Sequence, residues 1–214
     1  APYEIRDALC AAAGEQVMNL LARNIRPRDI VTRKAFENAA MCVAATGGST
    51  NAALHLPAMA HEAGIDFDLF DVGEIFRKTP YIGNLKPGGQ YVAKDLFEAG
   101  GIPLVMKALL DGGYMHGDVM TVTGKTMAEN LAKVKFNPNQ DVIRPTSNPF
   151  SSTGGVVSLK GNLAPDGAIV KIAGLKELRF VGPARVFDNE EACFECVDKR
   201  EYKEGEVLVI RNEG

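Results

Sequence analysis

Hydrophobic and polar positions alternate with a helical period over most of the first 135 residues. After Thr32, four apolar residues follow the i, i+3, i+4, i+7 spacing of one buried helix face, namely Phe36, Ala39, Ala40 and Val43. Thr32 is a favourable N-cap, and Gly47 lies where a left-handed C-cap is expected. The pattern therefore predicts a helix between Thr32 and Gly47.

Other helices are predicted on both sides of this one, beginning with the N-terminal segment, which reads as the middle of a helix. Ser49 is a favourable N-cap for a helix that Pro57 should kink, because proline lacks a backbone donor. Asp71 and Glu74 have the spacing of a capping box. A further helix is expected over residues 102–113, from Ile-Pro to Gly-Gly. This half indicates a layered α/β or α-rich domain.

The amino-acid composition changes in the segment FNPNQDVIRPTSNPF (Phe136–Phe150), where three prolines and three asparagines occur within fifteen residues. Such a composition is typical of a loop or linker. We therefore expect residues 1–145 to form part of an N-terminal α/β domain and residues 146–214 to form part of a C-terminal domain.

Short β-rich runs dominate the second segment and are separated by Gly, Pro, Asn and Asp. The predicted strands are 156–160, 168–172, 178–181, 184–187 and 207–210. One helix interrupts them, capped near Asp188 or Asn189 and running through Cys196. The expected fold class is α/β, with a layered α/β part followed by a small β-barrel or sandwich.

Composition narrows the possible partners. The chain is 46% hydrophobic and 24% charged with a formal net charge of -3, so it has no basic excess for nucleic acid or an anionic membrane. No apolar run approaches the roughly 20 residues that a membrane helix needs. Glu4 and Asp7 near the start argue against a signal peptide. A small molecule or another protein is the expected partner.

The four cysteines do not have the spacing of a secreted disulfide framework, which favours a cytoplasmic location or an organelle matrix. Cys193 and Cys196 form a CxxC pair without a second pair or a nearby histidine, so core packing is the expected role. Of the three histidines, His55 and His116 have no visible acidic or cysteine partner in the sequence. All three, including His61, are interpreted as structural or solvated.

Two glycine-containing motifs precede predicted helices. GKT at residues 124–126 lacks the glycine that a phosphate loop requires at position 119, where valine stands, so a plain turn before a helix is expected. GGST, formed by Gly47, Gly48, Ser49 and Thr50, has free N–H groups that favour a carboxylate or phosphate, which makes these residues candidate substrate contacts. A simple turn between two packed helices explains GGST equally well.

Five longer runs together resemble the dihydroxy-acid and 6-phosphogluconate dehydratase family. They are ATGGSTNAALHL (Ala45–Leu56), residues 86–113, residues 116–131, GNLAPDGAIVKIAG (Gly161–Gly174) and residues 205–214, and they occur in the family's order over essentially the whole chain. The resemblance implies an N-terminal α/β domain and a C-terminal β-barrel like the swivelling domain of aconitase.

Within this family, the runs AGGIPLVMKALL and GDVMTVTGKTMAENL are most similar to dihydroxy-acid dehydratases. The implied enzyme is a hydro-lyase of branched-chain amino-acid synthesis that converts a 2,3-dihydroxy acid to a 2-keto acid. Two alternatives stay open: a sugar-acid dehydratase for arabinonate, xylonate or 6-phosphogluconate, and a non-catalytic binding or assembly module of the same fold.

The resemblance also implies an iron–sulfur cluster that acts as a Lewis acid on the 3-hydroxyl, and Mg²⁺ that holds the carboxylate and the 2-hydroxyl. The family's cluster cysteines lie upstream of the matched segment and its base serine lies downstream. No catalytic residue is therefore carried over, and only Glu213 matches a family Mg²⁺ ligand. We expect a full-length cytoplasmic homodimer, of which this chain is an inactive fragment that binds neither cofactor stably.

Overall fold

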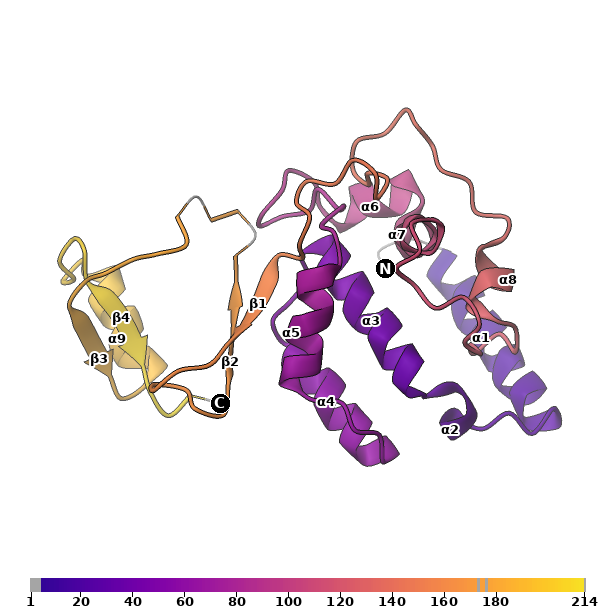
Figure 1. The fold of residues 1–214 in the computed structure, drawn as a ribbon, viewed down its shortest axis with the longest axis horizontal. Helices are drawn as coiled ribbons and strands as arrows, with labels where there is room; N and C mark the ends of the chain where they lie inside the picture. Colours follow the sequence, from indigo (N-terminus) through magenta and orange to yellow (C-terminus); the bar gives the residue numbers. More distant parts are fainter. Residues whose placement is uncertain (1–4, 173, 176, 214) are drawn as a thin grey trace. The chain divides into compact units, whose positions relative to one another are not determined.

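The computed structural model describes residues 5–172, 174–175 and 177–213 (Figure 1). Contacts within the chain divide it into two compact units, Ala1–Gly174 and Leu175–Gly214. In the described part, the larger unit is helical with one pair of strands, and the smaller unit has one helix and two strands. The fold is thus a mixture of helices and strands, as the sequence predicts.

The larger unit begins with α1 (Ile5–Ala22), α2 (Pro27–Ile30) and α3 (Arg33–Thr46). It continues through α4 (Ala52–Ala63), α5 (Leu69–Lys78), α6 (Ala93–Ala99), α7 (Gly101–Asp111) and α8 (Met127–Leu131) to the strands β1 (Val156–Leu159) and β2 (Ala168–Lys171). The smaller unit consists of β3 (Ala184–Phe187), α9 (Glu190–Asp198) and β4 (Val207–Ile210).

Helix α3 has both ends that its sequence predicts. The Thr32 hydroxyl accepts a hydrogen bond from the N–H of Ala35 at 3.3 Å, and Gly47 ends the helix with a φ of 59°. Of the predicted face, Phe36 and Ala40 are buried, and Ala39 and Val43 are half-buried against the same core. The prediction for this helix is therefore confirmed, as is that for α7, whose bounds lie close to those expected.

The capping box predicted for α5 is wrong by one turn. Asp68 is the N-cap, and its carboxylate accepts hydrogen bonds from the N–H groups of Phe70 and Asp71. The Asp71 carboxylate accepts a bond from the N–H of Asp68 at 3.0 Å. Glu74, the predicted partner of Asp71, instead pairs with Arg77 and Lys78 in the next turn. Two successive acidic pairs have the same spacing, and only their backbone conformation distinguishes them.

Two hydrophobic cores hold the larger unit together. The first lies between α3, α4, α5 and β1, which are neighbours in Figure 1, and includes Phe36, Leu56, Phe76 and Val156. The second lies where the end of α3 meets α7 and the segment around Ile82. Helix α5 approaches β1 so closely that a Cβ at Gly73 would lie 1.8 Å from the Ser158 hydroxyl oxygen. Glycine is therefore required at this crossing.

The strands form two ladders that differ in direction. In the larger unit β1 pairs antiparallel with β2, with Val156 opposite Lys171, and in the smaller unit β3 pairs in parallel with β4 across α9. The strand predicted at residues 178–181 is absent: Leu178, Phe180 and Val181 are 75%, 65% and 81% exposed and pair with no strand in the described residues. An apolar run without a partner strand does not form a ladder.

Neither ladder closes into a barrel within the described ranges, so the C-terminal barrel stays a prediction, as does the domain boundary near residue 145.

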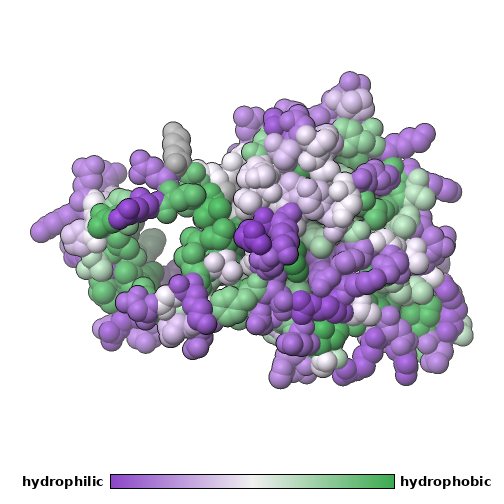
Figure 2. Space-filling model, viewed as in Figure 1, coloured by the Kyte–Doolittle hydropathy of each residue, from purple (hydrophilic) through white to green (hydrophobic). Residues whose placement is uncertain are grey.

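Apolar side chains are visible on the surface of the parts of the chain that contain the strands (Figure 2). Helix α1 also exposes its apolar residues, with Val17, Met18 and Leu21 between 62% and 70% exposed. In the part of the chain that is described, no helix combines the length and apolarity needed to cross a membrane.

Candidate functional site

The GGST turn joins α3 to α4 in a conformation that requires glycine at its first position. Gly47 has a φ of 59°, and a Cβ there would lie 2.8 Å from Cε2 of the Tyr81 ring. The N–H of Gly48 closes the end of α3 by donating to the Val43 carbonyl at 3.0 Å. The left-handed backbone and the packed ring both exclude a side chain, which fixes the path of the turn.

The other half of the turn leads into α4. The N-cap is Asn51 rather than the predicted Ser49, although the Ser49 hydroxyl accepts a hydrogen bond from the Asn51 N–H at 3.2 Å. The Ser49 carbonyl accepts from the N–H of Ala52. The N–H groups of Ser49 and Thr50 donate to no group in the described residues. The turn therefore has two free donors at the positive end of a helix.

A shallow hollow of about 370 Å³ opens beside this turn. The residues of GGST line it together with residues from other segments, namely Thr46, Leu85, Lys86, Leu96, Ile102 and Lys171. Lys171 on β2 donates through Nζ to the Gly48 carbonyl at 3.3 Å, across 123 positions of the sequence. The hollow thus joins the ATGGSTNAALHL and GNLAPDGAIVKIAG motifs, which are far apart along the chain.

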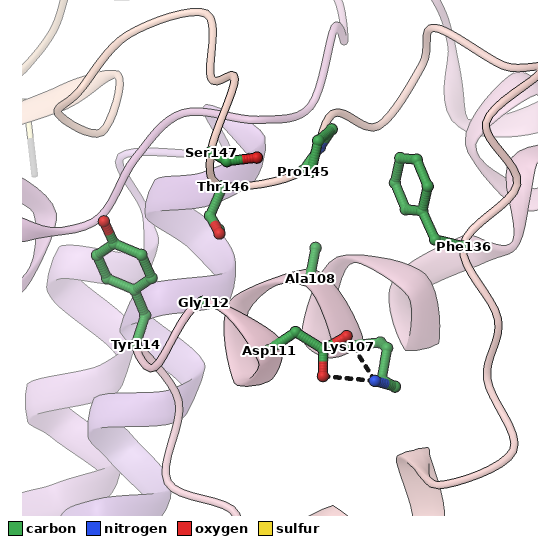
Figure 3. A pocket seen from close by; sticks show the side chains of 9 residues that line it. All are labelled: Lys107, Ala108, Asp111, Gly112, Tyr114, Phe136, Pro145, Thr146 and Ser147. Atoms are coloured by element: carbon green, nitrogen blue, oxygen red, sulfur yellow. Dashed lines mark hydrogen bonds and ion pairs between the residues drawn. The ribbon is translucent and has the colours of Figure 1, made fainter.

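A larger hollow of about 620 Å³ has a different electrostatic character (Figure 3). Its lysine, Lys107, is paired with Asp111 at 2.5 Å on the same helix, α7. Pro145, Thr146 and Ser147 line the side opposite this pair. Because the lysine charge is already balanced, this hollow offers less attraction to an anion than the one beside GGST.

Glu213, the predicted Mg²⁺ ligand, is exposed in the smaller unit. Its Oε1 accepts a hydrogen bond from the N–H of Glu190 at 2.9 Å, at the N-terminus of α9. In residues 5–172, 174–175 and 177–213, no group of three His, Cys, Asp or Glu side chains is placed to hold a metal ion.

Three of the four cysteines are at least partly buried, whereas Cys10 is exposed. Cys193 and Cys196 are 8% and 4% exposed on the inner face of α9, as predicted. Burial raises the pKa of the Cys42 thiol to about 12. A thiol with this pKa stays protonated at neutral pH and is a poor metal ligand.

One histidine has a partner that sequence analysis missed. His116 Nε2 lies 2.6 Å from the Glu37 carboxylate, and its backbone N–H and carbonyl are both bonded to the buried side chain of Asn38. Arg33 joins Glu37 to Asp71, with which it forms two hydrogen bonds of 3.0 and 2.6 Å. These residues are up to 79 positions apart, so only the fold brings them together. His55 and His61 are exposed, as expected for solvated side chains.

The Arg33 pair changes the ionisation of Asp71. Burial alone would raise the pKa of this carboxyl, but the hydrogen bonds from Arg33 and from the Asp68 N–H outweigh burial and lower it below its ordinary value. The network attaches the first turn of α3 to the first turn of α5. It stands away from the GGST turn, which follows the opposite end of α3.

Two family models match the chain. The model of the dihydroxy-acid/6-phosphogluconate dehydratase N-terminal part matches residues 1–130, and that of the C-terminal part matches residues 141–214. The chain belongs to this dehydratase family. The resemblance found in the motifs is thereby confirmed, and the hollow beside GGST is where two of those family motifs meet.

Curated members of the family are similar to this chain over its whole length. The chain is 71% identical to dihydroxy-acid dehydratase 2 of Bradyrhizobium diazoefficiens and 72% identical to the dihydroxy-acid dehydratase of Parvibaculum lavamentivorans. It is 66% identical to the dihydroxy-acid dehydratase of Pelagibacter ubique. In each case all of this chain is covered, but it spans only 37% or 38% of the relative's length.

We expect the Gly47→Ala substitution to lower the free energy of unfolding by about 2–3 kcal/mol, because it adds a clash with Tyr81 to the strain of a positive φ. Gly64→Ala is the matched control, since Gly64 has a φ of 72° but no atom within 4 Å of the place that a Cβ would take. It should cost about 1 kcal/mol. Urea denaturation measures both, and equal losses would show that the Tyr81 contact carries no energetic weight.

The Asp71→Asn substitution should lower the free energy of unfolding by about 1–2 kcal/mol at pH 7, because it removes the charge that Arg33 binds. The folded-state pKa of Asp71 is lowered, so its contribution is present above the unfolded pKa of about 3.9 and is lost as the pH falls through the folded value. Urea denaturation at pH 7 and below pH 4 should show the difference shrinking in acid. Asp66→Asn, at an exposed neighbour, should show neither effect.

Proposed function

We propose that the full-length protein containing this chain is a dihydroxy-acid dehydratase, a hydro-lyase of branched-chain amino-acid synthesis. The observation that supports this proposal is identity of 66–72% over the entire chain to proteins with that name. The reaction removes hydroxide from C3 and a proton from C2 of a 2,3-dihydroxy acid. The resulting enol tautomerises to a 2-keto acid, with one water released.

The proposal includes substrate contacts at Gly47, Gly48, Ser49 and Thr50. Support comes from the free N–H groups of Ser49 and Thr50 at the start of α4 and from the lysines beside them. A substrate of this class carries a carboxylate, and donors at the start of a helix are suited to bind such a group. In this proposal these residues contribute recognition and orientation of the substrate.

We also propose an iron–sulfur cluster and Mg²⁺ in the full-length enzyme, which rest on membership of the family. Glu213 would supply one carboxylate oxygen to Mg²⁺, with the remaining ligands from outside this chain. The Mg²⁺ would supply Lewis-acid chemistry at the acid's oxygens. A homodimeric assembly, a cytoplasmic location and a C-terminal β-barrel domain belong to the same proposal and have the same support.

The full-length protein should convert 2,3-dihydroxyisovalerate to its 2-keto acid, with the product measured by derivatisation of the new carbonyl. Arabinonate, xylonate and 6-phosphogluconate are the comparison substrates. A higher kcat/KM for any of these sugar acids would assign the protein to the other branch of the family. Failure with all four in a protein loaded with iron and Mg²⁺ would favour a non-catalytic role.

The Glu213→Gln substitution should raise the Mg²⁺ concentration needed for half-maximal activity by at least about tenfold, because even partners outside the ligand shell typically contribute that much. Glutamine keeps an oxygen that can accept from the Glu190 N–H, so the start of α9 should be preserved. Glu191→Gln, at an exposed acid of the same turn, is the control. An unchanged Mg²⁺ dependence in Glu213→Gln would contradict the assignment.

A further inference from the structure

We propose that the hollow beside the GGST turn binds one carboxylate oxygen of a small aliphatic acid, with Lys171 as the cationic side chain, and leaves the other carboxylate oxygen to Mg²⁺. The inference deepens the proposed function by assigning a specificity-determining residue that neither the sequence motifs nor the family match indicates, and it rests on that function only in naming the acid as the substrate. Four features support it: the charge of the hollow, its free donors, its apolar wall and a buried hydroxyl beside it.

The charge of the hollow is uncompensated. Its lining contains Lys86 and Lys171 but no aspartate or glutamate. Neither lysine has a carboxylate partner within the described residues, and Lys171 donates instead to the Gly48 carbonyl. This contrasts with Lys107, which Asp111 neutralises in the larger hollow of Figure 3. A cation bonded to a neutral carbonyl near other donors gains more from an anionic ligand.

Lys171 is positioned by a regular element. It is partly buried at the end of β2, opposite Val156, whose side chain is fully buried in the first core. The strand therefore fixes where the lysine stem begins, while the terminal amine can move over the short distance to a ligand. A charge held in this way loses less side-chain entropy on binding than a lysine on an open loop.

The backbone adds donors to the same place. The free N–H groups of Ser49 and Thr50 precede α4, a helix of twelve residues, whose dipole favours negative charge at this end. Lys171 on β2 thus contacts the turn that contains the two free donors. Together they form a mixed site of one cation and backbone N–H groups, which is suited to a carboxylate.

The hydroxyl of Tyr81 provides an independent indication of a missing partner. Tyr81 is 8% exposed, and its hydroxyl makes no hydrogen bond although it is buried. It lies 3.4 Å from the position of a Cβ on Gly47, directly behind the turn. Burial raises the pKa of this group, an effect that the nearby Leu85 N–H opposes without completing a hydrogen bond. Tyr81 itself does not line the hollow, but Gly47 and Leu85 beside its hydroxyl both do. In this proposal the bound acid therefore brings an oxygen within reach of the hydroxyl.

The remaining wall of the hollow is apolar, and it favours ligands whose carboxylate is attached to an aliphatic group. Leu85, Leu96 and Ile102 contribute hydrocarbon surface to the hollow, and Ile102 is 44% exposed. An aliphatic tail would cover this surface while its carboxylate meets the donors. Inorganic phosphate would leave the wall uncovered, and a neutral amide would leave the lysine charge unbalanced.

The test uses the full-length protein and 3-methylbutanoate, which has a carboxylate and a branched tail but no hydroxyl to eliminate. Isothermal titration calorimetry should detect its binding, and Lys171→Met should weaken it by about tenfold or more. Lys171→Arg should restore most of the affinity. Lys160→Met, at an exposed lysine near β1, is the matched control and should bind as the unmodified protein does. The neutral amide of the same acid should not bind.

Tyr81→Phe gives a second variant in case Lys171→Met fails to fold. It should weaken binding several-fold while leaving the thermal midpoint unchanged or higher, because it removes a buried hydroxyl without a partner. Equal affinity in unmodified protein and in Lys171→Met, or tighter binding of phosphate than of 3-methylbutanoate, would overturn the inference. Because this assay needs no turnover, a protein that binds the acid through Lys171 but dehydrates nothing would refute only the proposed function.

Discussion

Packing of small side chains along α3 is the constraint on which the larger unit depends. Ala40 and Ala44 are fully buried in the first core, and Ala45, one residue further on, is fully buried in the second. Alanine at these positions lets neighbouring elements approach closely, and larger side chains would overpack both contacts. With both cores fixed on one helix, the ends of that helix are also fixed. Its first turn carries the Arg33 and Glu37 network, and its last turn carries Gly47.

Local chemistry made several elements predictable. Thr32 and Gly47 delimit α3 because a side-chain oxygen and a left-handed glycine act on the residues beside them. Asn189 caps α9, and Thr126 caps α8, for the same reason. The predictions failed where two local readings were equivalent, as for Asp68 and Asp71, or where a partner was needed, as for the apolar run at residues 178–181. Propensity describes a segment, whereas a strand also requires a neighbour.

The candidate site depends on contacts that the order of the sequence does not reveal. GGST could be recognised as a turn with free donors, but Lys171 is 123 residues from Gly48 and occupies what reads as an ordinary alternating position of a strand. The pairing of His116 with Glu37 was hidden in the same way. For Glu213, the family motif supplied the candidate role, and the structure adds its bond at the start of α9. Sequence patterns identified the turn and the candidate ligand, whereas tertiary packing determines which side chains lie next to them.

The conformation of Gly47 also limits how the turn can change in length. With α3 held by two cores and α4 by the first, the few residues between them act as a spacer of fixed size. Each residue added to a helix rotates its direction by about 100° and advances it by about 1.5 Å. A residue inserted at the N-terminus of α4 that extends this helix would therefore either turn the free N–H groups away from Lys171 or draw α4 out of register with its core. The turn can exchange side chains at exposed Ser49 far more readily than it can gain or lose a residue.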